Sequence, residues 1–168
     1  LLLGALLGST DAASVFSILR SRQLNLKYGT ASMLEVESGS NDPCAYMMTV
    51  ILLSLMGTGG DMAVGTLIFS QLFFGLVCGG AIAWLAIQVL KRFEFETEGF
   101  NAAFVVAIAL LSYALPGVLG GNGYLSAYLV GILLGNSDIP DKKTLVHFFD
   151  GVTGLMQMLI FFLLGLLA

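Results

Sequence analysis

Four carboxylates lie in segments of the chain that are otherwise apolar enough to enter a membrane: Asp11, Glu35, Glu37 and Asp42. One charge at the centre of a bilayer costs about 2.5–3.5 kcal/mol on insertion scales, so such residues need an explanation. Burial penalises the ionised form of a carboxylate, so an intramembrane acid can hold a proton or a cation, but not favourably both. Glu35 lies only a few residues after Lys27. We expect Glu35 at the headgroup level, with a structural role.

The second acidic segment has a spacing that gathers oxygen ligands. Ser38 and Asp42 are four residues apart, which places them on one face of a helix. Glu37 and Asn41 share the adjoining face in the same way. Pro43 gives no N–H to the carbonyl one turn earlier, so it either kinks the helix or frees that oxygen. These hard oxygens suit a dehydrated alkali cation, whereas no helical His pair favours a divalent metal.

Asp11 belongs to a polar island, residues 8–14, in the middle of the first apolar segment. Its neighbours Ser9 and Thr10 are of the types that cap helix N-termini. A helix broken at membrane depth is tolerated only inside protein or beside a water-filled cavity, and broken helices near the midplane mark ion sites in secondary transporters. We therefore prefer a functional role for Asp11 to the alternative that it caps a short helix after a re-entrant loop.

The composition places the chain in lipid. Of 168 residues, 57% are hydrophobic and 11% charged, against roughly 45–50% apolar and about 25% charged in soluble domains. This excludes a soluble globular domain and a disordered region, and two cysteines are too few for a disulfide scaffold. No basic stripe indicates a nucleic-acid partner. The chain begins without Met, shows no signal peptide and stops within an apolar run, so we interpret it as an internal fragment.

Six apolar segments are candidates for membrane-spanning helices, each of which needs about 20 residues. They lie at about 1–19, 29–56, 62–90, 100–119, 121–135 and 146–168. We therefore expect an all-α, polytopic transmembrane bundle that forms a single domain over residues 1–168, with the short fifth segment paired tightly against the fourth. Two glycine pairs, Gly75 with Gly79 and Gly131 with Gly135, predict close helix packing.

All Lys and Arg residues fall in alternate connections, 20–28, 91–99 and 136–145. Cytoplasmic loops carry the excess of Lys and Arg in membrane proteins, so we expect these three loops in the cytoplasm and the two others outside. The first segment then runs from outside to inside. The expected location is an integral, multi-pass position in a membrane.

Three stretches carry a resemblance to a known family: GSTDAASVFS at 8–17, EVESGSNDP at 35–43 and GNGYLSAYLVGILLGN at 121–136. They resemble the NhaP-type monovalent cation:proton antiporters, in the electroneutral branch of the sodium/hydrogen exchangers, and are similar to the bacterial potassium/proton antiporters. The resemblance runs along essentially the whole chain, and it implies a location in the bacterial inner (plasma) membrane. It implies an inverted-repeat fold with broken helices crossing at the midplane, a core domain that moves against a dimerisation domain, and a homodimer of the full-length protein.

The resemblance also implies roles for residues. Asp42 carries either the cation or the proton, and Ser38 and Thr10 supply oxygen atoms to the same monovalent cation. Glu37 and Asn41 hold this site, often against an arginine of a later helix, and an Asn at that position is the pattern of electroneutral members. The resemblance also implies a supporting role for Asp11, whose charge offsets the partial charges of the half-helix ends.

These observations predict a secondary active transporter that exchanges K⁺ or Na⁺ for H⁺ by alternating access at a buried Asp42. No covalent chemistry and no cofactor are expected, so the protein is not predicted to be an enzyme. Three alternatives stay open. A cation channel would need repeated rings of ligands, a structural or sensor subunit would use the carboxylates only for assembly, and a transporter of organic substrates would need an aromatic or basic pocket. The sequence does not distinguish K⁺ from Na⁺.

Overall fold

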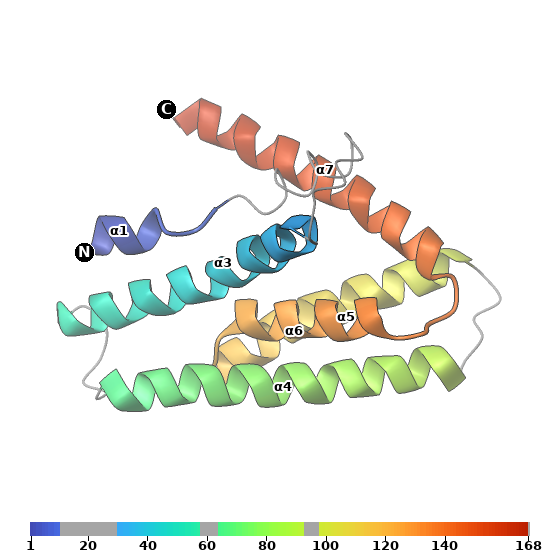
Figure 1. The fold of residues 1–168 in the computed structure, drawn as a ribbon, viewed down its shortest axis with the longest axis horizontal. Helices are drawn as coiled ribbons and strands as arrows, with labels where there is room; N and C mark the ends of the chain where they lie inside the picture. The colour runs from blue at the N-terminus through green and yellow to red at the C-terminus, as the bar shows by residue number, and fades with distance from the viewer. Residues whose placement is uncertain (11–29, 58–63, 93–97, 168) are drawn as a thin grey trace.

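The computed structural model describes residues 1–10, 30–57, 64–92 and 98–167, and the regular structure within these ranges is helical (Figure 1). The helices are α1 (Leu2–Leu6), α3 (Thr30–Leu55), α4 (Val64–Arg92), α5 (Glu98–Val118), α6 (Gly123–Asn136) and α7 (Lys142–Leu167). The predicted all-α class is therefore confirmed. The inverted repeat and the broken helix stay predictions.

The helices from α3 to α7 coincide closely with five of the expected segments. By length and composition, α4, residues Gly99–Val118 of α5, and α7 could cross a membrane, and α6 is a shorter apolar helix. Two boundaries differ from expectation, because α4 includes Lys91 and Arg92 and α7 begins at Lys142. Lys and Arg are good helix formers, and at the last turn of α4 their charge also complements the helix dipole.

The first expected segment is described only at its start. Helix α1 ends at Leu6, and the backbone of Ser9 and Thr10 is not helical. Asp11 and the rest of the segment lie outside the described residues. The helix thus stops where the polar island begins, and a second half beyond Asp11 stays a prediction.

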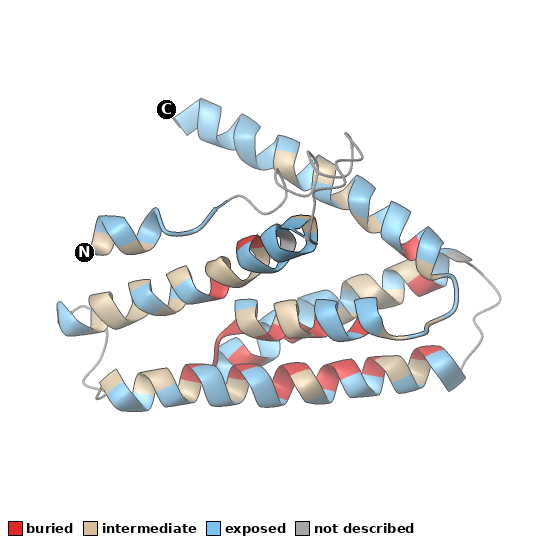
Figure 2. Cartoon of the chain, in the orientation of Figure 1, coloured by how far each residue is buried: buried red, intermediate tan, exposed pale blue. Residues whose placement is uncertain are grey.

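The core of the fold lies between α4 and α6 (Figure 2). Its buried members are apolar residues from one face of each helix: Cys78, Ile82, Ala83, Ala86, Leu90, Val130 and Leu134. Gly75 and Gly79 of α4 allow the close approach that the sequence predicts. A Cβ at Gly79 would lie 3.0 Å from Cα of Ser126, and a Cβ at Gly75 would lie 3.1 Å from the carbonyl oxygen of Asn122. Any larger residue at Gly79 would push α4 and α6 apart.

The second glycine pair does not behave as expected. A Cβ at Gly131 or at Gly135 would meet nothing within 4 Å among the described residues. Both glycines instead line an apolar cavity of about 370 Å³ between α5, α6 and α7. The prediction of tight packing at this pair is wrong for the described part of the chain, because spacing alone does not specify which side of α6 faces a neighbour.

α5 and α6 form the expected antiparallel pair, joined by a tight turn (Figure 1). Gly120 adopts a φ of +76°, which favours glycine, and the N–H of Gly121 donates to the carbonyl of Pro116 at 2.7 Å. A Cβ at Gly121 would lie 2.6 Å from Cβ of Phe74 in α4. The turn is therefore packed against α4, and it fixes where α6 begins.

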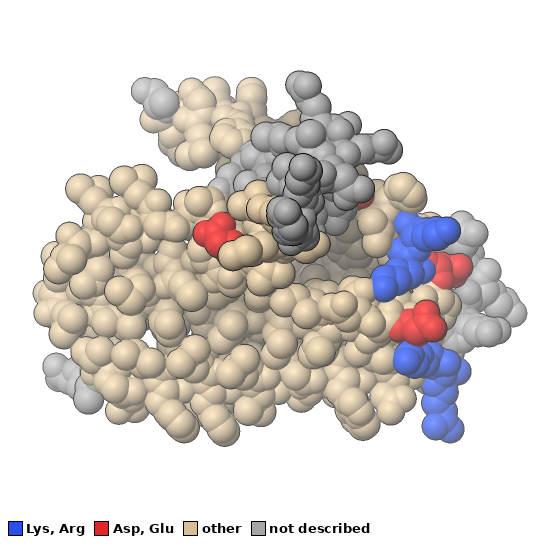
Figure 3. Space-filling model, in the orientation of Figure 1, with Lys and Arg blue, Asp and Glu red and all other residues tan. Residues whose placement is uncertain are grey.

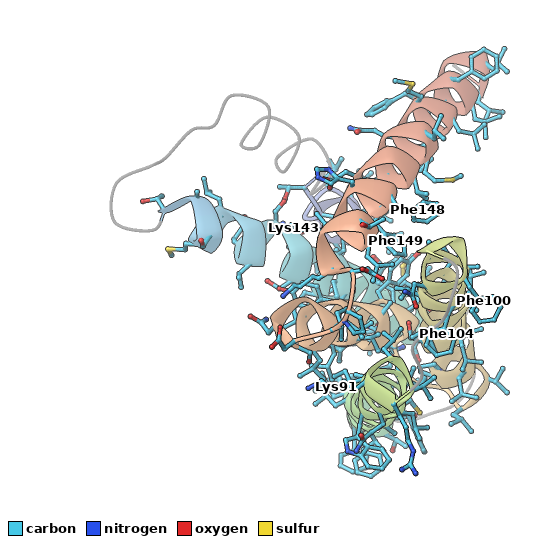
Figure 4. The ribbon with its side chains drawn as sticks, turned by 90° about the vertical axis from the view of Figure 1, so that its right-hand side faces the viewer. Lys91, Phe100, Phe104, Lys143, Phe148 and Phe149 are labelled. Carbon is cyan, nitrogen blue, oxygen red and sulfur yellow. The ribbon has the colours of Figure 1, made fainter. Side chains whose placement is uncertain are left out.

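Helix α7 leaves the bundle soon after it starts. Of the described elements it contacts only α5, and Leu145 is its buried residue. Beyond Phe148 and Phe149 it extends away from the other helices (Figure 4). Most of its apolar surface is thus open to lipid or to other protein.

The described basic residues gather at one end of the bundle (Figure 3). They are Lys91, Arg92, Lys142 and Lys143, which we call the basic end, and Lys91 and Lys143 both appear in the view onto that end (Figure 4). The turn between α5 and α6 lies away from the basic end, packed against Gln71, Phe74 and Gly75 of α4 and short of the far ends of α3 and α4 (Figure 1). This arrangement places two of the three loops predicted to be cytoplasmic on the same side.

We predict that the two ends of the bundle face opposite sides of the membrane. Cysteines that replace the exposed Met56 and Leu119 should react with an impermeant thiol reagent from outside, and one that replaces Lys143 only from inside. The background carries alanine at Cys44 and Cys78, the free cysteines of the described chain. Labelling of all three positions from one side would contradict this topology. Gly121, in the same turn, is buried against α4 and would not serve as a probe.

Candidate functional site

The described end of the N-terminal segment lies against the middle of α3. The hydroxyl of Ser9 donates to Oδ1 of Asp42. Nδ2 of Asn41 donates to Oγ1 of Thr10 at 2.6 Å, and the hydroxyls of Thr10 and Ser38 lie 3.1 Å apart. The backbone N–H of Thr10 also reaches Oδ1 of Asn41 at 3.5 Å. Two segments far apart in sequence thus bring hydroxyl, amide and carboxylate groups together, and we call these five residues the polar junction.

The residues of the polar junction differ in burial. Ser38 is buried, whereas Asn41 and Asp42 are half-buried by the described part of the chain. Glu37 is exposed, and its Oε1 lies 3.5 Å from Nδ2 of Asn41. The described Lys and Arg residues are confined to the basic end, so the described partner of the Asp42 carboxylate is the Ser9 hydroxyl. Full burial of Asp42 stays a prediction.

Helix α6 braces α3 directly after Asp42. Asn122 is 1% exposed, and its Nδ2 donates to the carbonyl of Pro43 at 3.0 Å. Oδ1 of Asn122 accepts from the N–H of Leu125 at 3.1 Å and so caps α6. The backbone N–H of Asn122 donates to the carbonyl of Gln71 in α4 at 3.1 Å. One residue therefore ties α3, α4 and α6 together beside the carboxylate.

Pro43 lies inside α3, and both expected possibilities, a kink and a freed carbonyl one turn earlier, stay predictions. Helix α3 is continuous from Thr30 to Leu55 on both sides of Pro43. The carbonyl of Pro43 itself accepts a hydrogen bond from Asn122. The proline thus lies at the contact between α3 and α6 and not at a break in the helix.

A second brace lies between one and two turns before Asp42. The hydroxyl of Tyr128 donates to the carbonyl of Val36 at 3.2 Å. A Cβ at Gly39 would lie 2.7 Å from Cε2 of the same tyrosine ring. The ring of Tyr128 therefore rests on the α3 backbone at a position where a larger residue would force it to move.

The structure brings together most of the predicted site residues. Thr10, Ser38 and Asn41 are in direct contact, and Glu37 lies at the edge of this group. Asp42 joins them through Ser9, the neighbour of Thr10, and not by a direct bond to Thr10 or Ser38. Asp11 lies outside the described residues, as does the side chain of Glu35. The roles assigned to all of these residues stay predictions.

Two residues of the site, Ser9 and Asn122, were not predicted. The sequence places Ser9 in the polar island, but its position two residues before Asp11 does not indicate that it reaches α3. Asn122 does carry a local signal, because an Asn directly before a helix is a preferred N-cap. The bond from Asn122 to Pro43 joins residues 79 positions apart, so only the fold reveals it.

Comparison with known proteins extends over the whole chain. The model of the family described as "Sodium/hydrogen exchanger, transmembrane" matches residues 1–168. The chain is 40% identical to the K⁺/H⁺ antiporter NhaP2 of Shewanella oneidensis and 37% identical to the K⁺/H⁺ antiporter NhaP of Alkalimonas amylolytica, in each case over 99% of the chain. It is 30% identical to the Na⁺/H⁺ antiporter ApNhaP of Aphanothece halophytica over 98% of the chain.

The chain covers only part of these relatives, 29% of the two K⁺/H⁺ antiporters and 33% of ApNhaP. No solved structure matches it. The relatives are named as transporters and not as enzymes, which agrees with the apolar helices and a multi-pass position in the membrane. The match along the full length of the chain shows that it belongs to the sodium/hydrogen exchanger family of transmembrane proteins.

Proposed function

We propose that the full-length protein exchanges a monovalent cation, K⁺ or Na⁺, for H⁺ across the membrane by alternating access at Asp42. The observation that carries the proposal is the polar junction, where Ser9 and Thr10 meet α3 at Ser38, Asn41 and Asp42. Relatives named as K⁺/H⁺ and Na⁺/H⁺ antiporters support the same reaction.

The chemistry of the polar junction fits an alkali cation. Oxygen atoms are the ligands that hard cations take, and Asp42, Ser38 and Thr10 offer one carboxylate and two hydroxyls from two segments. Thr10 and Ser38 already lie within hydrogen-bond distance of each other. In the proposed cycle the hydroxyl oxygens of Thr10 and Ser38 and the Asp42 carboxylate coordinate the cation. The carboxylate then no longer accepts the hydrogen bond from Ser9.

Exchange follows from competition for one carboxylate. When Asp42 binds the cation it holds no proton, and when it is protonated it has no charge to offer to the cation. If the two domains expose the site to one side at a time, one ion must leave before the other loads. The gradient of the cation and the gradient of protons are then coupled through a single residue.

The neighbouring residues have supporting roles in this proposal. Asn41 bonds to Thr10 and lies near Glu37, so it holds the N-terminal segment against α3. Glu37 orients Asn41 from the edge of the junction. Asp11 follows Thr10 directly in the chain, and we assign it the task of offsetting the charge of helix ends near the site.

The proposed function is tested with the full-length protein in everted vesicles that contain a pH-sensitive dye. After a proton gradient is established, addition of K⁺ or Na⁺ should dissipate it, and choline should not. Single-channel currents in planar bilayers would indicate a channel instead. Normal assembly of a larger complex without any cation-driven proton movement would indicate a structural subunit.

We further predict that the exchange is one cation for one proton. Asn41 stands beside Asp42 where a second carboxylate would have added a charge, so one carrier titrates per cycle. No net charge then crosses the membrane, whereas each uncompensated charge would couple the cycle to about 2.3 kcal/mol per 100 mV. A potassium-diffusion potential, set with valinomycin in proteoliposomes, should leave the rate of Na⁺/H⁺ exchange unchanged. A rate that follows the sign of the potential would point to Glu37 as a second proton carrier.

A further inference from the structure

A small cavity lined by tyrosines lies beside the polar junction. It has a volume of about 110 Å³ and is bordered by Tyr46 from α3, Tyr113 and Ala114 from α5, and Tyr124 from α6. The ring centroids of Tyr46 and Tyr124 are 5.1 Å apart, as are those of Tyr113 and Tyr124. Three helices thus direct phenol side chains at one space.

The cavity is close to Asp42 along α3. Tyr46 follows Asp42 by four residues, which places both on one face of the helix. From α6, Asn122 bonds to the carbonyl of Pro43, and Tyr124 lies two residues further along the chain. The cavity therefore lies beside the face of α3 that carries Asp42.

The cavity also lies on a defined side of Asp42. Helix α3 passes from Asp42 through Tyr46 toward Leu55, away from the basic end (Figure 1). The other lining residues, Gly117, Gly121 and Gly123, belong to the end of α5, the turn before α6 and the start of α6, which point away from the basic end (Figure 1). With the predicted orientation, the cavity is on the external side of Asp42.

We propose that the cavity between Tyr46, Tyr113 and Tyr124 is a second binding site for the transported alkali cation, reached from the external face. The inference rests on the proposed function for the identity of the ion. Aromatic faces attract cations within about 6 Å of the ring centroid, and phenol oxygens can replace part of the hydration shell. The volume is enough for an ion with a few waters, since one water occupies about 30 Å³. It is too small for organic ligands, whose sites measure about 300–1,000 Å³.

Occupancy of the cavity can be measured without transport. Ala114 lines the cavity and is exposed, so Ala114→Cys should react from outside with a cationic, membrane-impermeant thiol reagent. The background is the full-length protein with alanine at Cys44 and Cys78. Na⁺ or K⁺ should slow the reaction at least about threefold, a modest occupancy in line with a partly exposed cation–aromatic site, and choline should not. The Tyr46→Leu change should remove most of this protection.

Two controls separate the cavity from the polar junction and from general salt effects. Leu119→Cys is exposed near the same end but does not line the cavity, so cations should not protect it. Protection at Ala114→Cys should persist when Asp42→Asn is added, because the phenols remain. If Na⁺ or K⁺ protects Ala114→Cys but the wild-type protein shows no exchange, the proposed function is rejected and the proposal of a cation site in the cavity is retained.

Several results would overturn the proposal. These are equal protection by choline, equal protection at Leu119→Cys, protection that survives Tyr46→Leu, and labelling only from the cytoplasmic side. If Ala114→Cys does not fold, Gly117→Cys serves in its place, because a Cβ at Gly117 would meet nothing within 4 Å. Absence of protection in both cysteine variants would also reject the site.

Discussion

The Asp42→Asn change should abolish cation-driven proton movement in the full-length protein. An amide neither titrates in the working pH range nor offers a full negative charge to a cation, so both halves of the proposed exchange are lost. The hydrogen bond from Ser9 can still be accepted by the amide oxygen, so the contact between the N-terminal segment and α3 should survive. The dye assay in everted vesicles measures the activity, and size-exclusion chromatography in detergent measures folding.

Matched substitutions of other carboxylates test whether the loss of exchange is specific to Asp42. Asp138→Asn, in the exposed connection between α6 and α7, removes the same charge far from the site and should leave exchange intact. Asp11→Asn should weaken exchange or lower stability while residual activity remains. Full activity of Asp42→Asn would show that the carrier lies elsewhere, with Glu37 the next residue to test.

Asn122→Leu should cause the second large loss of exchange activity. It acts by displacing α3 beside Asp42, and it removes no charge. The change removes the donor to Pro43 and the cap on Leu125 from a buried site, and each buried polar group left without a partner costs about 1–3 kcal/mol. We expect the thermal midpoint in detergent to fall by about 5 °C or more. Exchange should fall at least tenfold, the factor that corresponds to about 1.4 kcal/mol, because α3 is no longer fixed next to Asp42.

Two further variants distinguish the brace from the cap. Asn122→Ser can still cap α6 but is too short to replace the bond to Pro43, so it should keep most of the stability and lose much of the exchange. Asn136→Leu, at the other end of α6, removes a bond only to Ile132 in the same helix and should change little. Equal effects of Asn122→Ser and Asn136→Leu would contradict a positioning role for Asn122.

The helices were predictable because their signal is local. Apolar runs and glycine or charged boundaries place α3 to α7 within a few residues of the structure, and the differences arise at Lys91, Arg92 and Lys142, where basic residues extend a helix. The packing was predictable only in part. Gly75 and Gly79 face α6, while Gly131 and Gly135 face a cavity, although both pairs have the same spacing. Spacing identifies a face and not its neighbour.

In the candidate site, too, the local spacing was predictable and the long-range contacts were not. The spacing of Glu37, Ser38, Asn41 and Asp42 along one helix predicted their common side, because four residues make about one turn. The contacts of Ser9 and Thr10 with α3 cross 28 to 33 positions, and the bond from Asn122 crosses 79. Such contacts depend on how the helices pack. The tyrosine cavity was missed for this reason, since its three rings come from three helices.

Helix α6 is too short to enter a membrane by itself during synthesis. Its 14 residues extend about 21 Å at 1.5 Å per residue, against a hydrocarbon core of about 30 Å. It is therefore expected to leave the translocon together with α5, as a hairpin closed by the turn at Gly120. The acceptors that Asn122 then needs, the carbonyls of Pro43 and Gln71, belong to helices made earlier. The partners of α6 are already in the bilayer when it emerges, so assembly can follow the order of translation.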